Sequence, residues 1–312
     1  YSNTTASDNT AVGYQAGYTN TTGTGNVALG KDALRSNTTA SYNTAVGSAA
    51  AYSTTTGESN TVLGQGAMYV STTGTDNVAV GRSALFNNTT GSYSVALGRS
   101  ALQNNTTASY NTAVGYQAGY SNATGVANVS IGYQAGYYVT GSNNTHVGYQ
   151  AGRGVSSPGT NGQNIYIGQA AGLNQAGGTS NNVAVGYAAA QNLTTTGGNT
   201  VVGNFACQNT TNGWSTAFGY SALTTNTTGG QNTAVGVYAL RYNTTGSTNT
   251  AIGHNANANN TVGNNNVTVG YEANFLNQTG DTNIAIGTYA NYSNVSSSNN
   301  VAVGLQANYS TT

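Results

Sequence analysis

Apolar positions return along this chain at a fixed interval of seventeen residues. In eighteen places, from Val12 to Val303, an aliphatic residue or Phe directly precedes a glycine. The repeating glycines from Gly13 to Gly132 are all seventeen residues apart, and so are those from Gly219 to Gly304. A period of this length is typical of a repeat array built from one small structural unit.

The residues before each glycine alternate in character. The position three before it is β-branched, the position directly before it is aliphatic or Phe, and a small residue usually lies between, as in Thr10, Ala11 and Val12. This alternation predicts a strand of about four residues whose larger apolar side chains face the interior. Ala also occurs three residues after every glycine, from Ala16 to Ala307, which predicts a second inward position.

A seventeen-residue unit buries little by itself, so neighbouring units must cover it. Parallel strands stack about 4.8 Å apart. The pattern therefore predicts an all-β fold, a parallel β-solenoid or β-roll of about eighteen coils. Asn lies four residues before the glycine in sixteen copies, with Ser94 and Ser215 in the other two. It is expected either to form an amide ladder along the axis or to serve a turn.

Residues 1–312 are expected to form a single repeat array. Between Gly132 and Gly186 the step becomes sixteen, twenty and then eighteen residues, and Pro158, the only proline, lies there. This predicts irregular coils with a protruding loop at about 139–181. Because the chain starts and stops within a coil, it is expected to be a segment of a longer array or a processed unit whose ends join in a filament.

The small residue between the two larger apolar positions is Ala in twelve copies. If it faces outward, it forms a flat apolar strip suited to close packing against another rod. The predicted interface includes Ala11, Ala28, Ala45 and Ala79. The alternative is that Ala tolerates a tight neighbouring turn.

Asn-X-Ser/Thr acceptor triplets occur twenty times, and ten share one corner of the repeat. A glycan requires such a triplet on an exposed surface. The predicted glycosylation sites are Asn3, Asn20, Asn37, Asn88, Asn105, Asn122, Asn226, Asn243, Asn277 and Asn294. The alternative is that Asn-Thr-Thr-Gly is turn chemistry.

Tyrosines recur directly after the glycine and again four residues later. Stacked aromatic residues on a repeating rod stabilise the stacking of coils. Tyr116 and Tyr133 are also candidates for a platform that binds sugar rings.

Charged residues make up 4% of the chain and the net charge is zero, which argues against nucleic-acid binding. No apolar run is long enough to cross a membrane, so this segment is not expected to insert into one. The lone Cys207 is expected to be a packing residue. His146 and His254 lie six coils apart and cannot share a metal ion. The chain is therefore not expected to be an enzyme or to carry a cofactor.

The repeat that begins Asn9-Thr10-Ala11-Val12-Gly13 and continues Tyr-Gln-Ala-Gly resembles the head repeats of YadA-like trimeric autotransporter adhesins and of related phage and viral fibre proteins. The resemblance covers the whole chain, although the coil here is longer. It implies a left-handed β-roll, three rolls around a common axis, and display or attachment at a surface.

The leading functional hypothesis is a non-catalytic structural protein, a repeat segment of an extracellular fibre, filament or surface adhesin. It would self-associate as a homotrimer or an end-to-end filament, at a cell or virion surface. The alternative is an adhesin module that binds surface glycans or matrix. A third hypothesis is an ice-binding solenoid with ranked threonines: Thr22, Thr39, Thr56, Thr73, Thr90 and Thr107.

Overall fold

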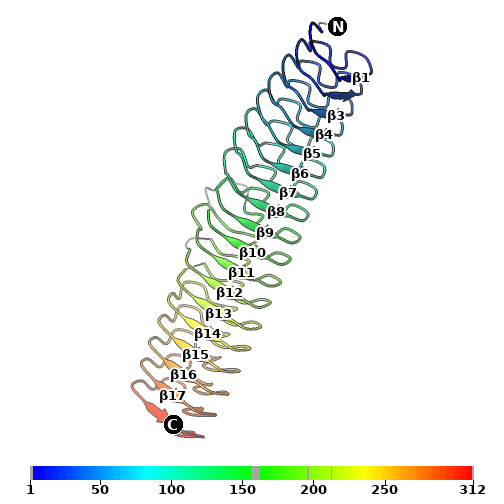
Figure 1. The fold of residues 1–312 in the computed structure, drawn as a ribbon. Coiled ribbons are helices and arrows are strands. Elements are labelled where there is room, and N and C mark those ends of the chain that lie inside the picture. Colours follow the sequence, from blue (N-terminus) through cyan, green and yellow to red (C-terminus); the bar gives the residue numbers. More distant parts are fainter. Residues whose placement is uncertain (1–2, 156–161, 195–196, 212, 311–312) are drawn as a thin grey trace. The chain divides into compact units, whose positions relative to one another are not determined.

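A computed structural model describes residues 3–155, 162–194, 197–211 and 213–310. The chain divides into two compact units, residues 1–160 and 161–312. Each unit is a stack of coils in which one short strand per coil lies beside the strand of the next coil (Figure 1). The rest of each described coil consists of turns and bends.

The first unit contains nine three-residue strands: β1 (Thr10–Val12), β2 (Val27–Leu29), β3 (Thr44–Val46), β4 (Thr61–Leu63), β5 (Val78–Val80), β6 (Val95–Leu97), β7 (Thr112–Val114), β8 (Val129–Ile131) and β9 (Thr145–Val147). The second unit contains nine more: β10 (Ile165–Ile167), β11 (Val183–Val185), β12 (Thr200–Val202), β13 (Thr216–Phe218), β14 (Thr233–Val235), β15 (Thr250–Ile252), β16 (Val267–Val269), β17 (Ile284–Ile286) and β18 (Val301–Val303).

Within each unit, consecutive strands pair in parallel and in register. Ala28 of β2 lies opposite Ala45 of β3, and Ala234 of β14 lies opposite Ala251 of β15. Equivalent residues of successive coils therefore form straight columns along the stack. The predicted all-β parallel β-solenoid is confirmed. The core of the predicted loop, residues 156–161, lies outside the described residues, while the flanking segments carry β9 and β10.

Glycine ends every strand for two physical reasons. Gly47 has a φ of +132°, a backbone conformation that residues with a side chain rarely adopt. In addition, a Cβ placed on Gly47 would lie 2.7 Å from the carbonyl carbon and oxygen of Gly64 in the next coil. The repeating glycine therefore permits both the turn and the close approach of successive coils.

The interior is narrow and is filled mainly by small residues. The middle residue of each strand from β2 to β18 is buried, and so is the alanine three residues after almost every repeating glycine. The next residue, Leu34 or Leu85 in regular coils, is also buried although its φ is about +50°. Its backbone N–H donates to the following coil, as from Leu34 to the Ala50 oxygen at 3.0 Å.

Two interior columns complement each other in volume. They are the middle position of the strand and the position four residues after the glycine. Where the strand carries buried His146 or Tyr166, the facing position is Gly152 or Gly172, and a Cβ there would lie 2.2 or 2.7 Å from the ring. In these two coils, therefore, a large residue at one position is accommodated by glycine at the other.

Candidate interaction surfaces

The orientation of the strands is the reverse of the sequence prediction. Ala28, Ala45 and Ala79 are all buried at the centre of their strands, so they face the core. Ala11 is exposed in the first strand, but its Cβ also faces the coil interior, 3.7 Å from where a Cβ of Gly17 would lie. The predicted alanine interface is therefore wrong, because a thin coil has room for Ala inside and places larger residues outside.

The outer face of the strands instead carries a strip in which the third residue of every strand is aliphatic or Phe, while the first residue is Val, Ile or, in nine strands, Thr. We define this apolar strip as the first and third residues of every strand. None of these residues is buried, and Leu97 retains 45% and Phe218 53% of its accessible surface. No charged side chain occurs at either position in any strand. An exposed apolar surface that extends along each unit is typical of a surface that binds another protein.

The predicted glycosylation corner points into the molecule. Nine of the ten predicted acceptors are buried, and only Asn3 is exposed. The Nδ2 atom of Asn105 donates to the Ala108 oxygen at 2.9 Å and to Asn88 Oδ1 at 2.8 Å. A glycan on this buried nitrogen would replace one of its two hydrogens and so remove at least one of these bonds. The prediction is wrong for Asn20, Asn37, Asn88, Asn105, Asn122, Asn226, Asn243, Asn277 and Asn294, because their amides satisfy the turn from inside.

The asparagines four residues before the glycine form a ladder. The Oδ1 atom of Asn43 accepts from the backbone N–H of Asn60 at 2.9 Å and from Asn60 Nδ2 at 3.0 Å. Asn60 Nδ2 also donates to the Gly74 oxygen at 2.9 Å. The same amide thus links coils along the axis and holds the adjoining turn, so both expected roles are present in one residue.

Tyr116 and Tyr133 belong to a stack of rings. Their centroids lie 5.4 Å apart at an interplanar angle of 12°, and Tyr149 continues the stack at 5.1 Å from Tyr133. The guanidinium of Arg99 lies over Tyr116, 5.7 Å from its centroid. Since a sugar ring would stack on an aromatic face, these contacts occupy the surface that the predicted platform requires. The geometry favours the stabilising role.

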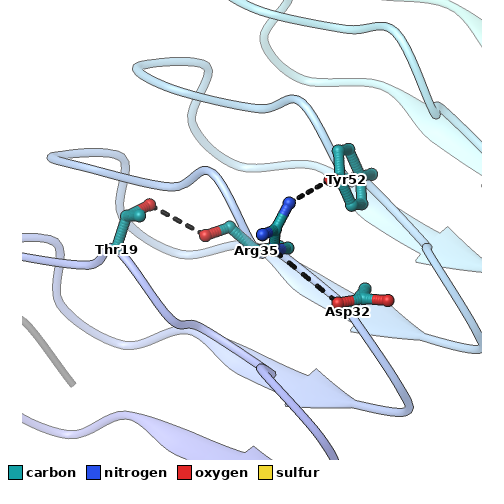
Figure 2. A network of polar contacts seen from close by, with 4 residues as sticks. All are labelled: Thr19, Asp32, Arg35 and Tyr52. Atoms are coloured by element: carbon teal, nitrogen blue, oxygen red, sulfur yellow. Dashed lines mark hydrogen bonds and ion pairs between the residues drawn. The ribbon is translucent and has the colours of Figure 1, made fainter.

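Charged side chains also link neighbouring coils. Figure 2 shows Arg35 between Thr19 of the preceding coil and Tyr52 of the following one. Thr19 Oγ1 donates to the Arg35 oxygen at 2.8 Å, Arg35 Nε lies 3.7 Å from Asp32 Oδ1, and a guanidinium nitrogen donates to the Tyr52 hydroxyl. The network ties three coils together at the surface.

Two consecutive threonines recur at one corner of the coil. The side chain of the first is hydrogen-bonded to the next coil, and the side chain of the second is exposed to solvent. Thr55 Oγ1 donates to the Thr72 oxygen at 3.1 Å, and this bond recurs between many successive coils. The following residues, Thr22, Thr39, Thr56, Thr73, Thr90 and Thr107, are exposed. These six hydroxyl-bearing side chains therefore repeat on the surface at the spacing of the coils.

Titratable groups in the interior are kept neutral by burial. His146 is fully buried, and desolvation lowers its pKa to about 4. Desolvation likewise raises the pKa of the Cys207 thiol to about 12, which makes it a poor nucleophile at neutral pH. In the described part of the chain, no three His, Cys, Asp or Glu side chains are grouped so that they could hold a metal ion.

Comparisons with known proteins add no family assignment. No protein-family model matches the chain, and no curated protein or solved structure matches it either. Within the ranges that the structure describes, no helix has the length and apolar character needed to cross a membrane.

The apolar strip was hidden from sequence reasoning because a three-residue strand has two possible orientations. One feature of the sequence did indicate the correct orientation. The bulky residues His146 and Tyr166 replace the central alanine only where a glycine stands six positions later, at Gly152 and Gly172. Such an exchange of size between two positions is expected when both face one closely packed interior.

Proposed function

We propose that this chain is a non-catalytic structural protein whose solenoid coils associate side by side with further copies through the apolar strip. The exposed apolar strip carries the proposal. Burial of apolar surface contributes about 25 cal/mol per Å², so a strip repeated in every strand supplies a large driving force for association.

A second copy of the same chain fits this surface better than an unrelated partner. Its strands have the same axial spacing, so apolar residues remain matched over many coils. The strip carries no charged side chain, and association therefore leaves no strip charge buried without a partner. The resemblance to adhesin head and fibre repeats supports three such copies around an axis and a location at a cell or virion surface.

The test is sedimentation analysis of three proteins over a range of concentrations. The native chain is expected to form a defined oligomer. The triple variant Leu63→Glu, Leu97→Glu and Ile131→Glu places three charges on the strip and is expected to be monomeric, since each charge would have to be desolvated at the interface.

A matched control places the same three charges on the threonine corner, as Thr56→Glu, Thr90→Glu and Thr124→Glu, where all three residues are exposed. This control is expected to associate like the native chain. A native chain that stays monomeric at every concentration, or two triple variants that behave alike, would show that the strip is not the interface.

Ice binding is a second candidate, favoured by the exposed rank of threonines. Because the neighbouring asparagines are buried, we do not expect sugars attached to them to cover this row of exposed threonines. The native chain would then produce thermal hysteresis, and the Thr56, Thr90 and Thr124 variant would lose it. No hysteresis in the native chain excludes this candidate while leaving the association proposal intact.

A further inference from the structure

The only tryptophan of the chain lies on the surface at a corner of the second unit. Trp214 retains 70% of its accessible surface and has a φ of +66°. It stands five residues before a repeating glycine, a position that Tyr42, Tyr93 and Tyr110 fill in the first unit. A large aromatic side chain this exposed is unusual, because tryptophan is highly buried on average.

The indole separates two hollows on this surface. One is lined by Ser180, Asn181 and glycines that include Gly197 and Gly198. The other is lined by Gly213, Gly230, Gln231 and Ser247. The six-membered part of the ring lies against Gly198, where an added Cβ would be 3.1 Å from Cε3. On this side the ring meets only the backbone of a glycine.

The neighbours of Trp214 distinguish it from the tyrosines at the same position of the repeat. Tyr93 and Tyr110 stack on each other at 5.2 Å with an interplanar angle of 4°, so each ring covers a face of the other. In the coils on either side of Trp214 the corresponding residues are Gly198 and Gln231, which carry no ring. An aromatic surface next to the Gln231 hollow is therefore open to a ligand.

The polar groups of this hollow are neutral. Ser247 Oγ already accepts from the Gly230 N–H at 3.2 Å. The exposed amide of Gln231 offers both a donor and an acceptor beside the ring. Neither set of lining residues contains a charged side chain, so the hollows offer no cation for a phosphate or carboxylate.

We propose that Trp214 and Gln231 form a binding site for a neutral hexopyranose unit of a glycan. The apolar C–H face of the sugar stacks on the indole, and its hydroxyls bond to the Gln231 amide. An aromatic wall with a few placed polar groups is the usual composition of a small-ligand site. The site goes beyond the structural role, because it gives the fibre a defined place of attachment.

Trp214 is also its own reporter, since no other tryptophan contributes to the fluorescence of the folded chain. Titration of the native chain with neutral tetrasaccharides of glucose, galactose and mannose is expected to change the emission saturably for at least one of them. The same sugar is expected to protect Trp214 from quenching by acrylamide. No saturable change with any of the three would overturn the proposal.

Variants are compared by saturation-transfer NMR of the bound sugar, which does not depend on tryptophan emission. Trp214→Ala is expected to abolish binding, and Gln231→Ala to weaken it at least tenfold. Tyr93→Ala, an aromatic residue lost at the same repeat position, is the control and should bind like the native chain. Binding retained by Trp214→Ala would overturn the proposal, as would equal binding of adenosine monophosphate at the same site.

The result is independent of lateral association. Trp214→Ala leaves the apolar strip unchanged and should sediment like the native chain. Loss of sugar binding with normal sedimentation supports the site, whereas failure of the strip variants to alter sedimentation bears only on the structural proposal.

Discussion

The regular coil at β5 and the coil at β10 fill two equivalent interior positions in opposite ways. In the β5 coil, Ala79 occupies the strand centre and Leu85 fills the space six residues later. In the β10 coil, Tyr166 occupies the strand centre and Gly172 leaves the space empty for its ring. The difference shows that a large residue can occupy either of the two positions when the other position is small.

The largest effect is expected from Tyr166→Ala. Removal of a buried aromatic ring opposite a glycine leaves a cavity that the stacked coils cannot close, and the expected loss is about 3–5 kcal/mol in the free energy of unfolding. Gly172→Leu alone is also expected to destabilise, because its side chain would enter the space of the ring. Denaturant unfolding of each variant measures both losses.

The double variant Tyr166→Ala with Gly172→Leu tests shared volume directly. It recreates the arrangement of the β5 coil, and Leu is compatible with the backbone because Leu85 has a φ of +50°. The double variant is expected to recover at least half of the loss caused by Tyr166→Ala. Strictly additive losses would contradict the shared interior.

The buried His146, which also lies opposite a glycine, is expected to make the free energy of unfolding depend on pH. Its folded pKa of about 4 lies below the ordinary value, so the unfolded chain takes up a proton first as the pH falls. The stability contributed by neutral His146 is therefore present above about pH 6.5 and declines as the pH falls toward 4, by about 3 kcal/mol in total. Unfolding curves of the native chain and of His146→Ala should differ in slope over this range.

The exposed His254 supplies the control for this measurement. His254→Gln should retain the decline in stability between pH 6.5 and 4. If the decline persists in His146→Ala, the buried imidazole is not its source.

A smaller loss is expected at the buried asparagine corner. Asn105→Ala removes two donated hydrogen bonds and leaves the Ala108 and Asn88 oxygens without that donor, at a cost of about 1–3 kcal/mol. Thr107→Ala, on the exposed side of the same corner, should change stability by less than about 0.5 kcal/mol. Equal losses of stability in the two variants would mean that the buried amides contribute no more to the free energy of unfolding than the exposed threonines.

The smallest effect is expected when the folded chain is treated with a reagent that alkylates thiols, because Cys207 should hardly react. Because the thiol is buried and its pKa is about 12, alkylation of the folded chain at pH 8 should be very slow, and it should become fast in denaturant. Mass spectrometry of samples quenched at successive times measures the rate. Rapid alkylation under native conditions would mean that this coil opens locally.

Much of the fold could be predicted because the repeat leaves few alternatives. The strict recurrence of the glycine sets the coil length, and the period-two pattern before it sets the strand. The invariant Ala from Ala16 onward was correctly predicted to face inward. Cys207 was also correctly predicted to be a buried packing residue, because it stands where Leu34 and Leu85 stand in other coils.

The surface could not be predicted as well, because hydrophobicity alone does not orient a three-residue strand. Val46 and Ala45 are both apolar, and the usual expectation places the larger one inside. The solenoid interior is too narrow for this arrangement in most coils, so Ala45 is buried and Val46 is partly exposed. The asparagine corner, polar in sequence, lies inside for a different reason, because its amides bond to the backbone of the turn and to one another.

The sequence by itself determined the parallel stack, its period and the place of each glycine, since these follow from local backbone requirements that repeat in every coil. Only the tertiary structure decided which side of each strand is covered. That choice depends on the width of the closed coil and on contacts between residues six or seventeen positions apart. It moved the apolar strip to the outside and turned the predicted acceptor asparagines inward.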